Sequence, residues 1–199
     1  NMTTVTGNDG SGVIYGCREL IDHVGQYKDL KFPAQLTDAP EMVLRGGCVG
    51  IQKMEYLPGR GVYEYPYTPE SFPWFYDKEQ WIKYLDMLVE NRMNSLYLWN
   101  GHPFASLVKL EEYPFAVEVD EETFKKNEEM FSFLTAEADK RGIFVIQMFY
   151  NILLSKPFAE HYGLKTQDRN RPITPLVSDY TRKSVAAFIE KYPNVGLLV

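Results

Sequence analysis

The chain has 199 residues and a formal net charge of −6, from 21 Lys and Arg against 27 Asp and Glu. It contains no basic tract or stripe, which argues against nucleic acid and anionic membranes as partners. The 14 Tyr, 12 Phe and 3 Trp can bury a sizeable core. Cys17 and Cys48 are too few for a disulfide framework, and no His, Cys or Asp spacing matches a metal site, so we expect neither metal nor cofactor.

Residues 1–40 are predicted to be the C-terminal part of a small α/β domain. A glycine-rich turn over 7–12 leads into a helix with an apolar face. The turn lacks both the Walker Lys-Ser/Thr ending and the G-x-G-x-x-G spacing, so a phosphate loop is not predicted. This piece is too small to bury a core alone, and we expect it to need partners outside it.

From residue 41 onward, short apolar segments alternate with helical periodicity. The predicted strands are Met42–Leu44, followed by Arg45, then Ser95–Trp99, Ile143–Phe149 and Val195–Val199. The predicted helices between them begin near Asp77, Asp120 and Ser178. Apolar strands alternating with helices are typical of a parallel sheet.

The connections favour a particular kind of parallel sheet. Turns before the strands are short and loops after them are long, as in a (β/α)8 barrel whose site lies at the C-terminal strand ends. Four strands make half of such a barrel, and the last apolar run stops at Val199. We therefore predict that residues 41–199 form the first half of a (β/α)8 TIM barrel and that the chain is a fragment. An open doubly wound sheet is the alternative.

The candidate substrate-binding residues are the polar and aromatic side chains expected at the strand ends. They are Arg45, Trp99, Asn100, His102, Tyr150 and Asn151. Indole rings stack on the apolar faces of sugars, while amides and arginine hydrogen-bond sugar hydroxyls in fixed directions. This combination predicts a carbohydrate ligand.

Each of these residues also has a structural interpretation. Arg45 could be an ion-paired residue beside a flexible glycine loop, and Trp99 a core aromatic at the end of its strand. His102 could be a capping or surface-loop residue, and the two asparagines simple turn residues. Their joint placement, rather than any single residue, favours the functional interpretation.

Two stretches of the sequence resemble a known group of enzymes. Gly7–Leu20 reads G-x-D-x-x-G-x-x-Y-G-x-x-x-L, and Asp38–Gly46 reads D-x-P followed by R-G, with Met42 where an aromatic residue is usual. Their order and spacing resemble the glycoside hydrolase clan that includes family 20 β-hexosaminidases, family 84 N-acetylglucosaminidases and family 67 α-glucuronidases. Asn91–Asn94 also fits this resemblance, and the remainder matches in architecture.

The resemblance implies a glycoside hydrolase that removes a terminal sugar, a hexosaminide, uronide or related residue, from an oligosaccharide, polysaccharide or glycan. In the clan, the arginine that matches Arg45 often holds hydroxyls of the non-reducing sugar. The hexosaminidase carboxylates follow the fourth strand, so the catalytic residues are expected beyond Val199 and the fragment is expected to be inactive. Secretion or a periplasmic location is also implied.

The sequence departs from the hexosaminidase pattern after the second strand. Trp99-Asn-Gly-His-Pro-Phe replaces the usual H-x-x-D, which leaves the identity of the sugar open. A non-catalytic carbohydrate-binding barrel is the alternative function.

Overall fold

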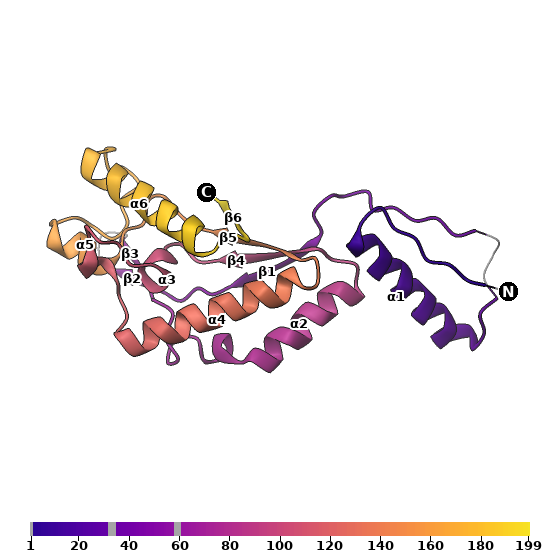
Figure 1. Cartoon of the computed structure of the whole chain (residues 1–199). Helices are drawn as coiled ribbons and strands as arrows, with labels where there is room; N and C mark the ends of the chain where they lie inside the picture. The colour runs from indigo at the N-terminus through magenta and orange to yellow at the C-terminus, as the bar shows by residue number, and fades with distance from the viewer. Residues whose placement is uncertain (1, 32–34, 58–60) are drawn as a thin grey trace.

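The computed structural model describes residues 2–31, 35–57 and 61–199. Helix α1 (Gly10–Tyr27) lies at one end of the molecule (Figure 1), where Arg18 pairs with Glu90 at the end of α2 (Lys78–Glu90). The Asp9 carboxylate caps this helix by accepting a 2.7 Å hydrogen bond from the Gly12 N–H. No residue of α1 is buried, and Ile21 is 59% exposed, so its apolar face is largely uncovered.

The predicted parallel sheet is confirmed. It comprises β1 (Gly46–Gly50), β4 (Ser95–Trp99), β5 (Phe144–Met148) and β6 (Val195–Leu198), which pair in that order. Every neighbouring pair is parallel, so the strands follow one another across the sheet in chain order. The helices α2 (Lys78–Glu90), α4 (Glu121–Asp139) and α6 (Pro175–Lys191) connect them.

Polar N-caps define where these helices begin. Asp77 accepts a 2.9 Å hydrogen bond from the Gln80 N–H, as predicted for α2. Helix α6 begins earlier than the predicted cap at Ser178, because Thr174 is its N-cap and Pro175 its first residue. The fixed φ of proline suits the first helical position, where the missing N–H leaves no hydrogen bond unmade.

The first strand was predicted incorrectly. Met42 and Val43 lie in a bend, Leu44 and Arg45 have no regular secondary structure, and β1 begins at Gly46. A Cβ added at Gly46 would lie 1.8 Å from the Ser95 carbonyl oxygen, and one at Gly47 would lie 2.4 Å from the Tyr84 hydroxyl. These glycines therefore allow close packing against β4 and α2, which the apolar pattern could not reveal.

The two faces of the sheet differ. Alternation directs Leu96, Leu98, Val145 and Val195 to one face, where they join helical side chains in a single apolar core. The opposite face carries Phe144, which is 62% exposed. Within the described residues, one face of the sheet is thus packed and the other is only partly covered.

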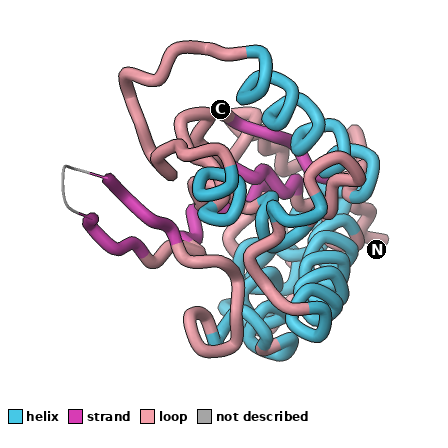
Figure 2. Tube along the Cα trace, turned by 90° about the vertical axis from the view of Figure 1, so that its left-hand side faces the viewer, coloured by secondary structure: helices cyan, strands magenta, loops and turns pink. Residues whose placement is uncertain are grey.

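Long segments follow the first three strands at their C-terminal ends. The hairpin of β2 (Met54–Leu57) and β3 (Gly61–Glu64) follows β1 and extends away from the body (Figure 2), an element absent from the sequence prediction. The segment then continues through η2 (Pro73–Tyr76). The loop after β4 holds α3 (Phe104–Leu107) and η3 (Pro114–Ala116), and the loop after β5 holds α5 (Lys156–His161). No helix in these described ranges is long and apolar enough to cross a membrane.

Candidate functional site

Five of the six predicted binding residues lie together beyond the C-terminal ends of β4 and β5. Trp99 ends β4, and its ring makes an edge contact with Tyr150, with centroids 6.2 Å apart. The indole Nε1 is buried and has no hydrogen-bond partner among the described residues. This aromatic pair therefore offers an apolar ring surface together with an unused donor.

Asn100 organises the loop that follows Trp99. Its Nδ2 donates to the Ile51 carbonyl at 2.8 Å, and its Oδ1 accepts from the His102 N–H at 2.8 Å. The side chain is 2% exposed, so it holds two loops together and does not face solvent. Asn100 thus positions His102.

The His102 imidazole reaches into the loop layer. Its Nε2 lies 2.8 Å from the Tyr180 hydroxyl on α6, and its ring contacts Phe104 edge-on. Burial lowers the pKa of His102 to about 3, because the charged imidazolium would lose its hydration there. The imidazole is consequently neutral at any ordinary pH.

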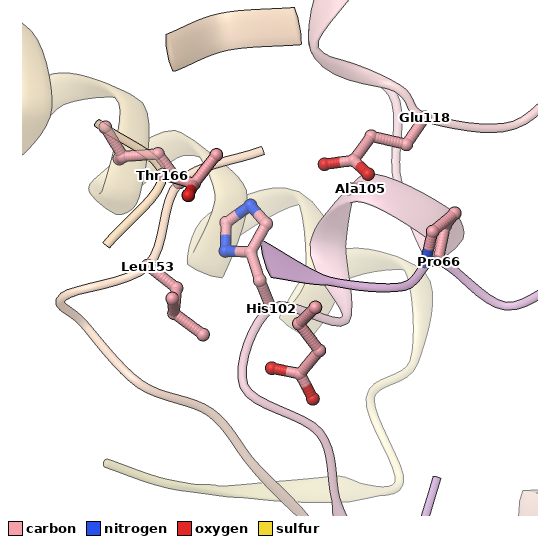
Figure 3. A pocket seen from close by; sticks show the side chains of 8 residues that line it. Pro66, His102, Ala105, Glu118, Leu153 and Thr166 are labelled. Atoms are coloured by element: carbon pink, nitrogen blue, oxygen red, sulfur yellow. The ribbon is translucent and has the colours of Figure 1, made fainter. Parts of the chain in front are cut away.

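A small pocket lies where the three loops meet (Figure 3). The His102 ring projects between Thr166 and Leu153 on one side and Ala105 and Glu118 on the other. A second depression beside it shares His102 and Leu153 and reaches Tyr150 and Asn151. The full lining of the first pocket is Glu64, Pro66, His102, Ala105, Glu118, Leu153, Leu154 and Thr166.

Glu64, the last residue of β3, is the most perturbed acid of this pocket. Its Oε1 accepts a 2.7 Å hydrogen bond from the Gly101 N–H, whereas its Oε2 is buried and unpartnered within the described part of the chain. Burial raises the pKa of Glu64 to about 7, although hydrogen bonds from Gly101 and Gln52 oppose the rise. The carboxyl therefore changes charge near neutral pH.

Glu118 is the second acid of the pocket. Its two oxygens accept from the Tyr63 hydroxyl at 2.9 Å and from the Lys156 N–H at 2.6 Å. Burial raises the pKa of Glu118, and these two hydrogen bonds oppose the rise. Glu118 thus ties the hairpin to the start of α5.

Gly101 makes the close approach of these loops possible. A Cβ at this position would lie 2.0 Å from Glu64 Oε2 and 2.3 Å from Leu153 Cδ1. A larger residue would push the hairpin and the β5 loop apart, so the glycine is required by the packing of the site.

The two acids were missed by reasoning from the sequence. Each is a single glutamate among apolar or aromatic neighbours, as in Val62-Tyr63-Glu64-Tyr65 and Val117-Glu118-Val119. A lone acid inside such a stretch is a signal of a carboxylate that tertiary structure buries.

Arg45 does not join this cluster. It was predicted at the C-terminal end of a strand, but it directly precedes β1 and so lies at the N-terminal end of this strand, away from the site. Its guanidinium donates to the carbonyls of Arg92 at 2.9 Å and Met42 at 2.6 Å, and it lies over the Tyr15 ring. The predicted placement is wrong, and the predicted contact with substrate stays a prediction.

The donor set of the site suits hydrogen bonding to a polar organic ligand. Among the described residues, no group of three or more His, Cys, Asp and Glu side chains is arranged to hold a metal ion. A neutral imidazole, two carboxyls and an aromatic pair can instead grip hydroxyl groups and ring faces.

Comparison with known proteins places a glycoside hydrolase among the solved structures that the chain resembles. No family model matches the chain, and no curated protein matches it. The solved structure of a GH138 enzyme targeting pectin rhamnogalacturonan II matches at 82% sequence identity with a TM-score of 0.91. The match covers 98% of this chain and 22% of that chain, so the chain spans about a fifth of the enzyme's length.

The matched enzyme differs in family from the group that the two sequence stretches resemble. GH138 is a glycoside hydrolase family other than families 20, 84 and 67, so the match agrees with the resemblance in the class of enzyme and does not support the clan that the resemblance named. Over nearly its whole length, the chain is similar to a segment of a glycoside hydrolase.

Proposed function

We propose that this chain forms the first half of a (β/α)8 barrel in a longer glycoside hydrolase that acts on pectin rhamnogalacturonan II. The observation that carries the proposal is the 82% identity to a GH138 enzyme targeting that polysaccharide. In this proposal, residues 1–40 close a small preceding α/β domain and residues 41–199 begin the catalytic barrel. The enzyme would act outside the cytoplasm, by secretion or in the periplasm, where the polysaccharide is accessible.

The sheet supports the barrel interpretation over a doubly wound sheet. The four strands follow chain order without reversal, whereas a doubly wound sheet reverses direction at a switch point. The connecting helices share one core on one face of the sheet. The opposite face, with Phe144 exposed, is where the inward-facing side chains of a closed barrel would pack.

The strand-end residues supply the sugar-binding role in this proposal. Trp99 and Tyr150 present ring surfaces on which the apolar face of a sugar could stack. Asn151 is exposed beside them in the second depression. The two carboxylates that cleave a glycosidic bond would come from strand ends in the other half of the proposed barrel.

The test uses the full-length protein that contains this chain. Incubated with rhamnogalacturonan II, it should release sugar, which chromatography of the products detects. Trp99→Ala should lower kcat/KM by up to about tenfold, because one stacking contact is worth about 0.5 to 1.5 kcal/mol. Trp74→Ala is a matched control, because Trp74 packs on Phe72 and Trp81 away from the pocket.

Each result separates the alternatives. Binding of the polysaccharide without release of sugar would favour the non-catalytic carbohydrate-binding barrel. Neither binding nor release would contradict both functions. Release of sugar that is equally sensitive to Trp99→Ala and Trp74→Ala would remove Trp99 from the proposed binding surface.

A further inference from the structure

The pocket between the hairpin and the loops after β4 and β5 contains an incomplete hydrogen-bond network. Glu118 uses both oxygens, on the Tyr63 hydroxyl and the Lys156 N–H. Glu64 accepts a hydrogen bond from the Gly101 N–H through Oε1, and its buried Oε2 has no hydrogen-bond partner within 3.5 Å among the described residues, although the side chain of Gln52 lies close enough to lower the pKa of Glu64. A buried carboxyl oxygen without a donor costs free energy, so the site is poised to accept a hydrogen bond.

The size of the pocket limits what can complete this network. It has room for about one water molecule. A whole sugar ring does not fit, but one hydroxyl group reaching in from a ring at the pocket mouth does. Pro66, Ala105 and Leu153 contribute apolar walls to the pocket, and His102, Glu118 and Thr166 line the rest of it beside Glu64.

We propose that this pocket is a subsite for a single sugar hydroxyl, which donates its hydrogen bond to Oε2 of Glu64. The inference rests on the proposed function and adds a specificity-determining residue that does not follow from the strand-end pattern. The hairpin residue Glu64 would thereby place part of the substrate against the loop after β4.

The fixed direction of the Gly101 hydrogen bond makes the role of Glu64 testable. The Gly101 N–H requires an acceptor, so Glu64→Gln would keep its amide oxygen on Gly101 and turn its NH2 group into the pocket. The polarity of the subsite is then inverted while the link between hairpin and loop is kept. Affinity should fall without loss of folding.

The ionisation of the pocket gives a second readout. The titratable groups near Glu64 are Glu118, His102 and Tyr67; burial keeps His102 neutral and raises the pKa of Tyr67 well above its usual range. A charged Glu64 accepts the stronger hydrogen bond, so binding should tighten as the pH rises through about 7. Glu64→Gln should abolish that change.

The experiment measures KM and kcat of the full-length protein on rhamnogalacturonan II from pH 6 to 8. Glu64→Gln should raise KM at pH 8 about tenfold and leave kcat within about twofold, as expected for loss of one charge-assisted hydrogen bond. Glu79→Gln, an exposed acid on α2, is the matched control and should behave as the wild type. Thermal unfolding of each variant checks that folding is retained.

The outcomes separate this inference from the proposed function. An active wild type with an unchanged KM for Glu64→Gln overturns the subsite and leaves the hydrolase proposal standing. A fall in kcat at constant KM also overturns it, because Glu64 would then serve the chemical step. A wild type that neither binds nor cleaves the polysaccharide ends the proposed function, and the inference with it.

Discussion

At the scale of the residue, the charge of Glu64 should set how stability depends on pH. Its pKa is raised from 4.5 to about 7 in the folded state, so the folded protein binds more protons than the unfolded chain between these values. The contribution of Glu64 to the free energy of unfolding is therefore fully present below its unfolded pKa, and it is lost as the pH rises through its folded pKa. Glu64→Gln removes this loss.

The melting temperatures of wild type and Glu64→Gln should accordingly diverge from pH 5 to pH 8. The variant should gain about 1 to 3 kcal/mol relative to the wild type, after allowance for partial exposure to solvent. His102 contributes a slope of the opposite sign between its lowered pKa of about 3 and 6.5, but both proteins retain it. A constant difference across this range would mean that Glu64 is not desolvated.

Arg45 provides a second prediction for a single side chain. Arg45→Ala removes hydrogen bonds to the carbonyls of Arg92 and Met42 and should cost about 1 to 3 kcal/mol of stability. Arg45→Lys should recover only part of this, because an ammonium cannot reproduce the planar fork of donors. Arg169→Ala, at an exposed loop position, is the control.

The measurements for Arg45 are the melting temperature and KM of the full-length protein. A lowered melting temperature with unchanged KM supports a structural role at the junction. A KM raised far more than the stability is lowered would restore the predicted contact with substrate.

The sequence predicted the positions of residues at the ends of β4 and β5 correctly, and their role in binding stays a prediction. Trp99 is the last residue of an apolar segment, so the polar residues after it were correctly expected at the C-terminal end of a strand. Glu64 and Glu118 stand out in the sequence only as lone acids among apolar or aromatic neighbours, and their meeting in one pocket could not be predicted, because it depends on a hairpin and loops that meet through Gly101. Arg45 was misplaced because Met42–Leu44 is more apolar than the glycine strand that follows.

At the scale of the element, the end of α2 contains an unusual backbone conformation. Arg92 follows the C-cap Asn91 with a φ of 57°, a left-handed conformation that usually favours glycine. Its N–H donates to the Val89 carbonyl at 2.9 Å, and its side chain pairs with Glu19 and with Asp38. These ion pairs link α2 to the N-terminal segment.

Substitutions at Arg92 should separate the backbone cost from the ion pairs. Arg92→Ala and Arg92→Gly lose the same pairs, but glycine adopts the left-handed conformation freely, so it should be more stable by about 1 kcal/mol. At Lys83, within α2, the order should reverse, because glycine weakens a helix interior by about 1 kcal/mol. Chemical unfolding of the four variants measures both differences, and the same order at both sites would contradict the assignment.

The elements themselves were largely predictable, because their signals are local. Asp77 caps α2 and Asp120 caps α4 through side-chain hydrogen bonds of 2.9 and 2.7 Å, and the sequence predicted that both helices begin near these residues. The sequence predicted a loop in place of the β2–β3 hairpin. Each of its strands has only four residues, and neither shows a clear alternation of apolar and polar residues. Its tie to the loop after β4 through Tyr63 and Glu118 is tertiary.

At the scale of the whole molecule, the open face of the sheet and its unpaired edges are the dominant feature. Phe144 is 62% exposed and Leu198 41% exposed, on the face opposite the connecting helices. Within the described residues, β1 and β6 each have one unpaired edge. Exposed edges and apolar faces promote association, so this chain alone should self-associate in solution and be inactive.

Phe144→Ser should have opposite effects in the two settings. In this chain alone it removes exposed apolar surface, so size-exclusion chromatography should detect less association. In the full-length protein the proposed barrel would bury Phe144, so the same change should destabilise it by about 2 to 4 kcal/mol. Ile173→Ser is the control, because Ile173 is 91% exposed in a loop outside the sheet and should lower stability in neither setting. Equal and small effects of Phe144→Ser in both settings would contradict closure of the barrel over this face.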